Sequence, residues 1–317
     1  MKKTLLGNLI LLFAAIIWGF AFVAQVISVG SGLGPVSFNA IRFMLGAVAL
    51  IPVILIFDRK GKSFFNKETV IGSLVSGVLL FSAANLQQYA LTINANPGFA
   101  GFITALYTVW TPIAYFVFFK KKTTANVWAA VGIALLGFYL LCMTDGGGIS
   151  FGVDVVILLI STFFWTAQIL AVDRFVEKVS PLRLSFGQFF VCATLSFIYA
   201  FIFERETMTV SAISGSMWSI LYCGLLSVGV AYTLQVVGQK MTNPVFAVII
   251  MSTESVFSAV GGALWNLIVP VAFHINQDIS PIGYVGCGVI FLGVILSQID
   301  VGAIFRRKRG LENEVDV

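Results

Sequence analysis

The chemically reactive side chain that stands out in this sequence is one carboxylate, Glu254, inside the apolar stretch 243–265. If that stretch is a membrane span beginning at Pro244, Glu254 lies about ten residues into it. This depth is about 15 Å at 1.5 Å per residue, close to the middle of a ~30 Å hydrocarbon layer. A carboxylate costs a few kcal/mol there, and such residues usually serve a function. We expect Glu254 to line a cavity, binding a substrate amine or carrying a proton, or else to form a structural hydrogen bond with neighbouring helices.

Arg42 is the second ionisable residue within a predicted span. It lies about seven residues into the span 35–57 from the predicted outer face, a depth from which an arginine side chain can reach the interface. Two roles stay open for it: holding loops or helix ends together, and gating or contacting a substrate carboxylate. If the spans bring Arg42 to Glu254, the two charges neutralise each other. Otherwise a proton or an amine-bearing substrate must neutralise Glu254.

Neutral polar and aromatic side chains mark the other spans. Polar side chains need partners where water is absent, so they face other helices or a wet cavity rather than lipid. Asn85 shares a helix face with Gln88 or Tyr89, which lie three and four residues further on. The aromatic residues are suited to form the walls of a cavity, although helix packing and interfacial belts explain each one equally well. The predicted substrate-binding residues are Trp18, Phe22, Asn85, Gln88, Tyr89, Tyr107, Trp110, Trp165, Gln168, Tyr232 and Glu254.

The residue types that carry catalysis or bind metals are nearly absent. His274 is the single histidine, and the four cysteines lie in apolar runs without CxxC pairing, where we interpret them as packing residues. No metal site, catalytic triad or cofactor is therefore predicted. A nucleotide-driven pump is excluded because the sequence has no GxxxxGK[ST] motif. We expect that the protein is not an enzyme.

Membrane helices must position these side chains, because 59% of the residues are hydrophobic, 10% are charged and the mean hydropathy is +0.99. The first apolar run is too long for a signal peptide, so we interpret it as an uncleaved first span. The predicted fold class is all-α integral membrane with ten transmembrane helices. Their predicted limits are 5–29, 35–57, 70–93, 97–119, 127–143, 152–172, 181–203, 216–237, 244–269 and 281–304.

The positions of the lysines and arginines predict the orientation of these spans. Cytoplasmic segments retain positive charge, and ten spans with both termini inside place every Lys and Arg except Arg42 and Arg205 in an inner segment. The predicted location is the cell (plasma) membrane, with a basic cytoplasmic tail at 306–309. We interpret the net charge of +5 as a topology signal and predict no nucleic-acid partner.

An internal repeat organises the chain. The sequence Asn-Pro-Gly-Phe-Ala at 96–100 recurs as Asn-Pro-Val-Phe-Ala at 243–247, an offset of 147 residues. We predict a first repeat at 1–146 and a second at 147–317, with five spans in each. Because five is odd, the second repeat enters from the opposite side of the membrane. Inverted repeats are typical of alternating-access transporters, whose ligand site lies near the midplane between the repeats.

These motifs together resemble a known family. Trp-Gly-Phe-Ala-Phe at 18–22, Arg42-Phe43, the two Asn-Pro motifs and Glu-Ser-Val-Phe at 254–257 resemble an EamA-type member of the drug/metabolite transporter (DMT) superfamily. The resemblance implies two EamA domains, a central cavity lined mainly by spans one, three, four, six, eight and nine, and transport of small organic metabolites. Family members commonly have Pro after the glutamate, where this chain has Ser255.

The predicted function is an alternating-access transporter, an exporter of small organic metabolites such as amino acids, working by facilitated or proton-coupled transport. A flippase of lipid-linked small groups is one alternative, but it needs basic residues for a phosphate and the spans offer only Arg42. A membrane-embedded enzyme is a weaker alternative. Besides its substrate and the bilayer we expect no partner other than a weak second copy, since Ala130 and Ala134 have the small-xxx-small spacing of packed membrane helices. A monomer or a weak dimer is therefore expected.

We predict that both termini and the segments 58–69, 120–126 and 173–180 are cytoplasmic. A reporter that works only in the cytoplasm, fused at Gly310, should therefore be active, because the basic residues before it hold the tail inside. A silent reporter at this position would contradict the ten-span topology.

Overall fold

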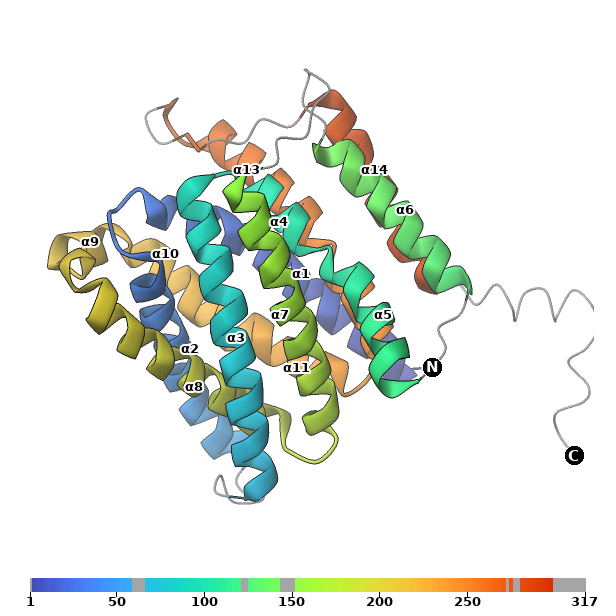
Figure 1. The fold of residues 1–317 in the computed structure, drawn as a ribbon, viewed down its shortest axis with the longest axis horizontal. Coiled ribbons are helices and arrows are strands. Elements are labelled where there is room, and N and C mark those ends of the chain that lie inside the picture. Colours follow the sequence, from blue (N-terminus) through green and yellow to red (C-terminus); the bar gives the residue numbers. More distant parts are fainter. Residues whose placement is uncertain are drawn as a thin grey trace, which may run out of the picture.

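The computed structural model describes residues 2–58, 66–120, 125–142, 152–271, 274–275 and 280–298, and these residues form helices and no strand. Figure 1 shows a bundle of helices with one helix pair, α6 and α14, side by side at its edge. The helices are α1 (Lys2–Val29), α2 (Pro35–Phe57), α3 (Lys67–Ile93), α4 (Pro97–Thr104), α5 (Tyr107–Phe119), α6 (Ala125–Cys142), α7 (Val153–Val176), α8 (Pro181–Phe203), α9 (Val210–Gly215), α10 (Met217–Leu221), α11 (Thr233–Gln239), α12 (Pro244–Met251), α13 (Glu254–Ile268) and α14 (Pro281–Gln298), with a 3-10 turn η1 (Arg205–Thr207) and a π-helix η2 (Tyr222–Tyr232).

Eight helical segments among the described residues are long and apolar enough to cross a membrane, so the protein is a multi-pass membrane protein. They are Lys3–Val29, Pro35–Phe57, Lys67–Ile93, Pro97–Phe118, Val153–Val176, Pro181–Phe203, Met217–Gln239 and Pro244–Ile268. The predicted fifth and tenth spans correspond to the shorter apolar helices Val127–Gly137 and Pro281–Gly293. Residue 143 of the fifth span and residues 299–304 of the tenth lie outside the described residues.

Asparagine and proline together begin two of the spans. Asn96 accepts a hydrogen bond from the backbone N–H of Phe99, and Asn243 accepts one from Val245. Proline follows each of them at the first helical position, where its missing N–H costs nothing. The repeated Asn-Pro sequence therefore builds the same helix start twice.

Both of these spans are broken after eight residues. Helix α4 ends at Thr104 and α5 begins at Tyr107, while α12 ends at Met251 and α13 begins at Glu254. In the second break the hydroxyls of Ser252 and Thr253 donate to carbonyls three residues earlier, at 2.7 Å in each case. Such bonds compete with the helical backbone ladder and bend helices. The two breaks are 147 residues apart, so each predicted continuous span is in fact two half-helices.

Helices α6 and α14 pack closely through small residues. A Cβ added at Gly137 would lie 2.7 Å from the Gly286 carbonyl oxygen, and one added at Gly293 would lie 3.1 Å from that of Ala130. Later residues of one helix thus meet earlier residues of the other, which makes the pair antiparallel. The small-residue face at Ala130 and Ala134 is therefore covered by α14 of the same chain.

Helix α8 holds α2 at both ends. At one end the Glu204 carboxylate accepts hydrogen bonds from the backbone N–H groups of Val36 and Ser37, at 3.2 and 2.7 Å, and so caps the start of α2. At the other end the Arg183 guanidinium donates to the Asp58 carboxylate at 2.8 Å and to the Asp58 carbonyl at 2.8 Å. These charge-assisted contacts fix the two helices to each other at both ends.

The contact between α1 and α13 generates a stability prediction. A Cβ added at Gly19 would lie 2.2 Å from the Phe257 Cβ and 2.7 Å from the Phe257 carbonyl carbon, so backbone would have to move. We expect Gly19→Ala to lower the free energy of unfolding by about 1–3 kcal/mol. Thermal unfolding of the purified protein in detergent measures this change.

Gly132→Ala is the matched control, because nothing lies within 4 Å of a Cβ at that position. It should leave the unfolding temperature unchanged or raise it slightly, since alanine favours a helix over glycine. Equal unfolding temperatures for the two variants would contradict the close α1–α13 contact.

Candidate functional site

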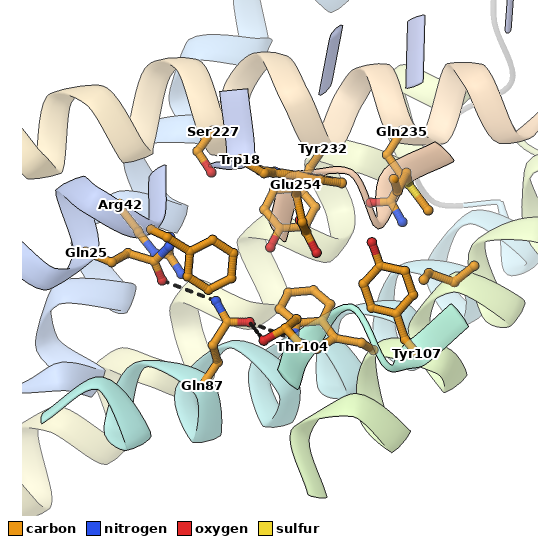
Figure 2. Close-up of a pocket in the computed structure, with 14 residues that line it drawn as sticks. Trp18, Gln25, Arg42, Gln87, Thr104, Tyr107, Ser227, Tyr232, Gln235 and Glu254 are labelled. Atoms are coloured by element: carbon orange, nitrogen blue, oxygen red, sulfur yellow. Dashed lines mark hydrogen bonds between the residues drawn. The ribbon is translucent and has the colours of Figure 1, made fainter. Parts of the chain in front are cut away.

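A central cavity collects side chains from all the long helices except α6, α8 and α14. The space between the atoms of its lining is about 450 Å³, with open solvent included. Figure 2 shows its side chains converging from opposite sides. The lining residues are Trp18, Phe22, Gln25, Arg42, Gln87, Thr104, Tyr107, Trp165, Ile169, Ser227, Tyr232, Gln235, Met251 and Glu254.

Three aromatic rings form one wall of the cavity. The Tyr232 ring lies 4.7 Å from the Trp18 ring, centroid to centroid, and 5.9 Å from the Trp165 ring, with which it is stacked at 16°. The rings come from α1, α7 and η2, so the wall joins three spans. Flat apolar faces of this kind suit the apolar or aromatic part of a small ligand.

The π-helix η2 aims two of the lining residues. A π-helix has more than four residues per turn, so residues five apart lie near one face. Ser227 and Tyr232 have this spacing and both line the cavity. Tyr222, five residues before Ser227, donates a hydrogen bond from its hydroxyl to the Ile17 carbonyl at 3.1 Å. π-helical turns are frequent at functional sites, and this one brings a hydroxyl and a tyrosine ring to the same wall.

Glu254 occupies the middle of the cavity. It is 5% exposed, it is the first residue of α13, and no basic side chain among the described residues pairs with it. The positive end of the helix dipole partly offsets the cost of its charge. Figure 2 shows its carboxylate facing the cavity and the Tyr107 hydroxyl pointing toward it. Because Tyr107 begins α5, both half-helix starts place a polar group at this point.

Gln87 connects four spans beside the cavity. Its carbonyl oxygen accepts hydrogen bonds from the Trp165 indole N–H at 3.0 Å and from the Thr104 hydroxyl at 3.4 Å. Its N–H donates to the side-chain oxygen of Gln25 at 3.4 Å. These hydrogen bonds, drawn as dashed lines in Figure 2, hold the polar side chains on this side of the cavity in place.

Arg42 lies inside the bundle and lines the cavity. The residue is 2% exposed, and its guanidinium carbon lies 5.4 and 5.0 Å from the ring centroids of Phe38 and Phe43. Cation–π contacts of this kind are worth about 0.5–2 kcal/mol each. The side chain is therefore enclosed by the helices, and no ion pair joins it to Glu254 among the described residues.

The structure brings together about half of the predicted substrate-binding residues. Trp18, Phe22, Tyr107, Trp165, Tyr232 and Glu254 line the cavity together with Arg42. Five others lie elsewhere: Asn85, Gln88, Tyr89, Trp110 and Gln168.

These five residues have other surroundings. Asn85 and Gln168 are tied to neighbouring side chains, Asn85 to Ser196 and Gln168 to Gln188. Gln88 donates to the Gln25 carbonyl at 3.3 Å. Trp110 packs on the Phe163 ring at 4.4 Å. Tyr89 is 51% exposed on the surface of the bundle.

Sequence analysis missed seven lining residues, and the signal for some of them was present. Gln25 lies three residues after Phe22 and seven after Trp18, which is the spacing of one helix face. Gln235 lies three residues after Tyr232 in the same way. Ser227 could not be found, because a five-residue spacing points to a common face only in a π-helix. The other missed residues are Gln87, Thr104, Ile169 and Met251.

Several buried polar atoms at the cavity have no hydrogen-bond partner within the described part of the chain. They are the Trp18 indole nitrogen, the Tyr107 hydroxyl and the side-chain oxygen of Gln235. Each unpaired buried group costs about 1–3 kcal/mol, so a ligand that paired with them would gain that energy on binding. The described residues contain no group of three or more His, Cys, Asp or Glu side chains that could hold a metal.

Comparisons with known proteins point to one family. A model of the EamA-like transporter family matches residues 5–143 and 153–299. An uncharacterized transporter of Archaeoglobus fulgidus is 26% identical over 303 residues, covering 94% of this chain and 88% of its own length. The uncharacterized transporter YoaV of Bacillus subtilis is 21% identical over 241 residues, covering 74% and 78%. A crystal structure shares the fold with a TM-score of 0.71 at 18% identity, over 92% of this chain and 96% of the other.

The position of Gln87 generates a prediction. Gln87→Met keeps the side-chain length but leaves the Trp165 N–H without its acceptor. We expect the free energy of unfolding to fall by about 1–3 kcal/mol, the usual cost of a buried unpaired donor. Thermal unfolding in detergent measures it. Tyr89→Phe, two residues away on the exposed face, is the control and should leave stability unchanged. A Gln87→Met protein as stable as this control would show that the hydrogen bonds of Gln87 do not stabilise the fold.

Proposed function

This chain belongs to the EamA-like transporter family, and from that premise we propose that it is an alternating-access transporter of small zwitterionic metabolites, such as amino acids. It is a membrane transporter by its membership of the family and by the eight helical segments among its described residues that are long and apolar enough to span a membrane. The proposal adds the mechanism and the class of substrate. The observation that carries it is the cavity in which Glu254 and Arg42 both lie without an ion-pair partner among the residues that the structure describes.

Reciprocal helix contacts support two inverted repeats of five spans. Gly77 packs against Val191, and Gly224 packs against Leu45. Gly77 and Gly224 are 147 residues apart, and Leu45 and Val191 are 146 apart, so one contact is the repeat image of the other. The α6–α14 pair is likewise reciprocal and antiparallel, as an axis in the membrane plane requires. Two such repeats can exchange conformations, opening one cavity to each side in turn.

The chemistry of the lining favours a zwitterion. Glu254 offers a carboxylate for an ammonium group, and Arg42 offers a guanidinium for a carboxylate, a pairing that is often bidentate. The aromatic wall of Trp18, Trp165 and Tyr232 accepts the apolar part of the same molecule. The unpaired indole nitrogen, hydroxyl and amide oxygen supply further hydrogen bonds. A small amino acid or related compound carries an ammonium group, a carboxylate and an apolar part that are complementary to these groups.

The lack of a cationic partner for Glu254 among the described residues supports proton coupling. A buried carboxylate without a cation must be neutralised, and either a proton or the ammonium group of a substrate can do so. Because both act on one carboxylate, they compete, and release of one favours binding of the other. We propose that this exchange drives export of the substrate against entry of a proton. Uptake into inverted and right-side-out vesicles distinguishes export from import.

The first test identifies a substrate and then removes the carboxylate. Cells expressing the protein are screened for protection against toxic amino acids and their analogues, and the protecting compound is used in proteoliposomes. Transport is measured from about pH 5.5 to 8, around physiological pH. We expect Glu254→Gln, which mimics the neutral carboxyl group, to fold normally and to lose the pH dependence of transport.

Glu68→Gln is the matched control, because Glu68 is partly exposed, forms an ion pair with Lys178 and does not line the cavity. It should keep the pH profile of the parent protein. An unchanged pH profile in Glu254→Gln would leave Glu254 a structural group, and no protection by any amino acid, nucleoside or cationic drug would count against the substrate class.

A further inference from the structure

The charge of Arg42 is buried without an acidic partner. No carboxylate among the described residues forms an ion pair with it, and the side chain is 2% exposed. An unpaired cation inside a membrane protein is costly, and such residues face a cavity or a ligand path. The Phe38 and Phe43 rings offset only part of that cost. A negative charge from a bound ligand would offset the rest.

A chain of amide side chains holds the guanidinium in place. The Arg42 Nε donates to the Asn39 side-chain oxygen at 2.7 Å. The Asn39 NH₂ group donates to the Asn85 side-chain oxygen at 2.8 Å and to the Ala84 carbonyl at 3.0 Å. The Asn85 NH₂ group donates in turn to the Ser196 hydroxyl at 3.1 Å and to the Phe81 carbonyl at 2.8 Å. Helices α2, α3 and α8 are thus joined behind Arg42.

The direction of every bond in this chain is set by Arg42. A guanidinium has only N–H donors, so Asn39 must present its oxygen to it. The NH₂ group of Asn39 then has to donate, which turns the oxygen of Asn85 toward Asn39. Both amide groups have all their donors paired, and a network satisfied in this way is rigid. This series of hydrogen bonds therefore fixes the Nε side of Arg42, and Arg42 itself lines the cavity.

An amide at position 39 has a consequence that an acid would not have. Asparagine and aspartate have the same shape and both accept the Nε hydrogen bond. Aspartate would also neutralise the guanidinium, whereas asparagine orients it and leaves its charge available. The neutral Asn39 side chain therefore holds the guanidinium while leaving its charge to pair with an anionic group of a ligand.

We propose that Arg42 is the subsite for the carboxylate of the substrate, and that Asn39 and Asn85 are positioning residues that aim its guanidinium and keep its charge free. The inference rests on the proposed function, and it adds the orientation of the ligand: carboxylate toward α2, ammonium toward Glu254 on α13. Gln188, which lies 146 residues after Arg42, is the repeat counterpart and carries no charge. The carboxylate subsite is therefore confined to one half of the cavity.

Three matched probes test the subsite on the full-length protein in detergent by titration calorimetry. 3-Phenylpropionate carries only a carboxylate, 2-phenylethylamine only an amine, and L-phenylalanine both. In Asn39→Asp the new carboxylate pairs with Arg42 and occupies it. We expect 3-phenylpropionate binding to weaken about tenfold or more, the value of a charge-assisted hydrogen bond, while 2-phenylethylamine binding stays the same or strengthens.

Two further variants separate positioning from folding. Asn39→Ser removes the anchor without adding charge, so 3-phenylpropionate should bind about two- to tenfold more weakly with no gain for 2-phenylethylamine. Asn8→Asp makes the same chemical change at a residue that contacts Thr242 and not the cavity, and it should bind all three probes as the parent does. A role of Asn39 in stability alone would lower the unfolding temperature and leave the ratio of the two affinities unchanged.

The outcomes distinguish this inference from the proposed function. Unchanged 3-phenylpropionate affinity in Asn39→Asp and Asn39→Ser, or no binding of 3-phenylpropionate to the parent protein, overturns the carboxylate subsite. Glu254→Gln should weaken only the two amine-bearing probes. If it weakens neither while the Asn39 variants weaken 3-phenylpropionate, the subsite stands and the role of Glu254 in substrate binding fails.

Discussion

The interior of a membrane offers no water, so each polar side chain inside this bundle must find its partner within the protein. Most of them do: Gln87 joins four spans, and Asn39 and Asn85 join three. Among the described residues, the exceptions at the cavity are the Trp18 indole nitrogen, the Tyr107 hydroxyl and the Gln235 side-chain oxygen, while others, such as the Ser76 and Ser219 hydroxyls, lie away from it. The paired groups hold the helices together, and the three unpaired atoms at the cavity are free to bind a ligand.

Much of the fold could be predicted from the sequence, because proline fixes where helices start. Pro35, Pro97, Pro181, Pro244 and Pro281 each stand at the first position of a helix, and each also opened a predicted span. The breaks inside two of the spans were not predictable. They depend on hydroxyl groups that compete with the backbone and on tertiary contacts that hold the bend. The π-helix was not predictable either, because its amino-acid composition is that of an ordinary apolar α-helix.

The residues of the candidate site were predictable on helices where their spacing defines one face. They were not predictable where several polar residues follow one another along the helix. Trp18 and Phe22 stand four apart on α1, and both line the cavity. On α3 the polar residues are consecutive, so spacing favoured Asn85 and Gln88, whereas Gln87 is the residue that lines the cavity. Asn85 is instead drawn to Asn39, and Gln88 to the backbone of α1. The direction in which each of these side chains points depends on contacts with other helices, which the sequence alone does not reveal.

The double attachment of α2 to α8 has a mechanical consequence. Glu204 attaches α2 to α8 at one end and Arg183 does so at the other, so a movement of one helix would carry the other helix and the Arg42 side chain with it. Glu254 sits at a break in a different span, where a hinge requires few backbone hydrogen bonds to change. In the proposed alternating-access cycle, a hinge at this break would change the distance between the Arg42 and Glu254 side chains. The length of molecule that fits between them would change with it.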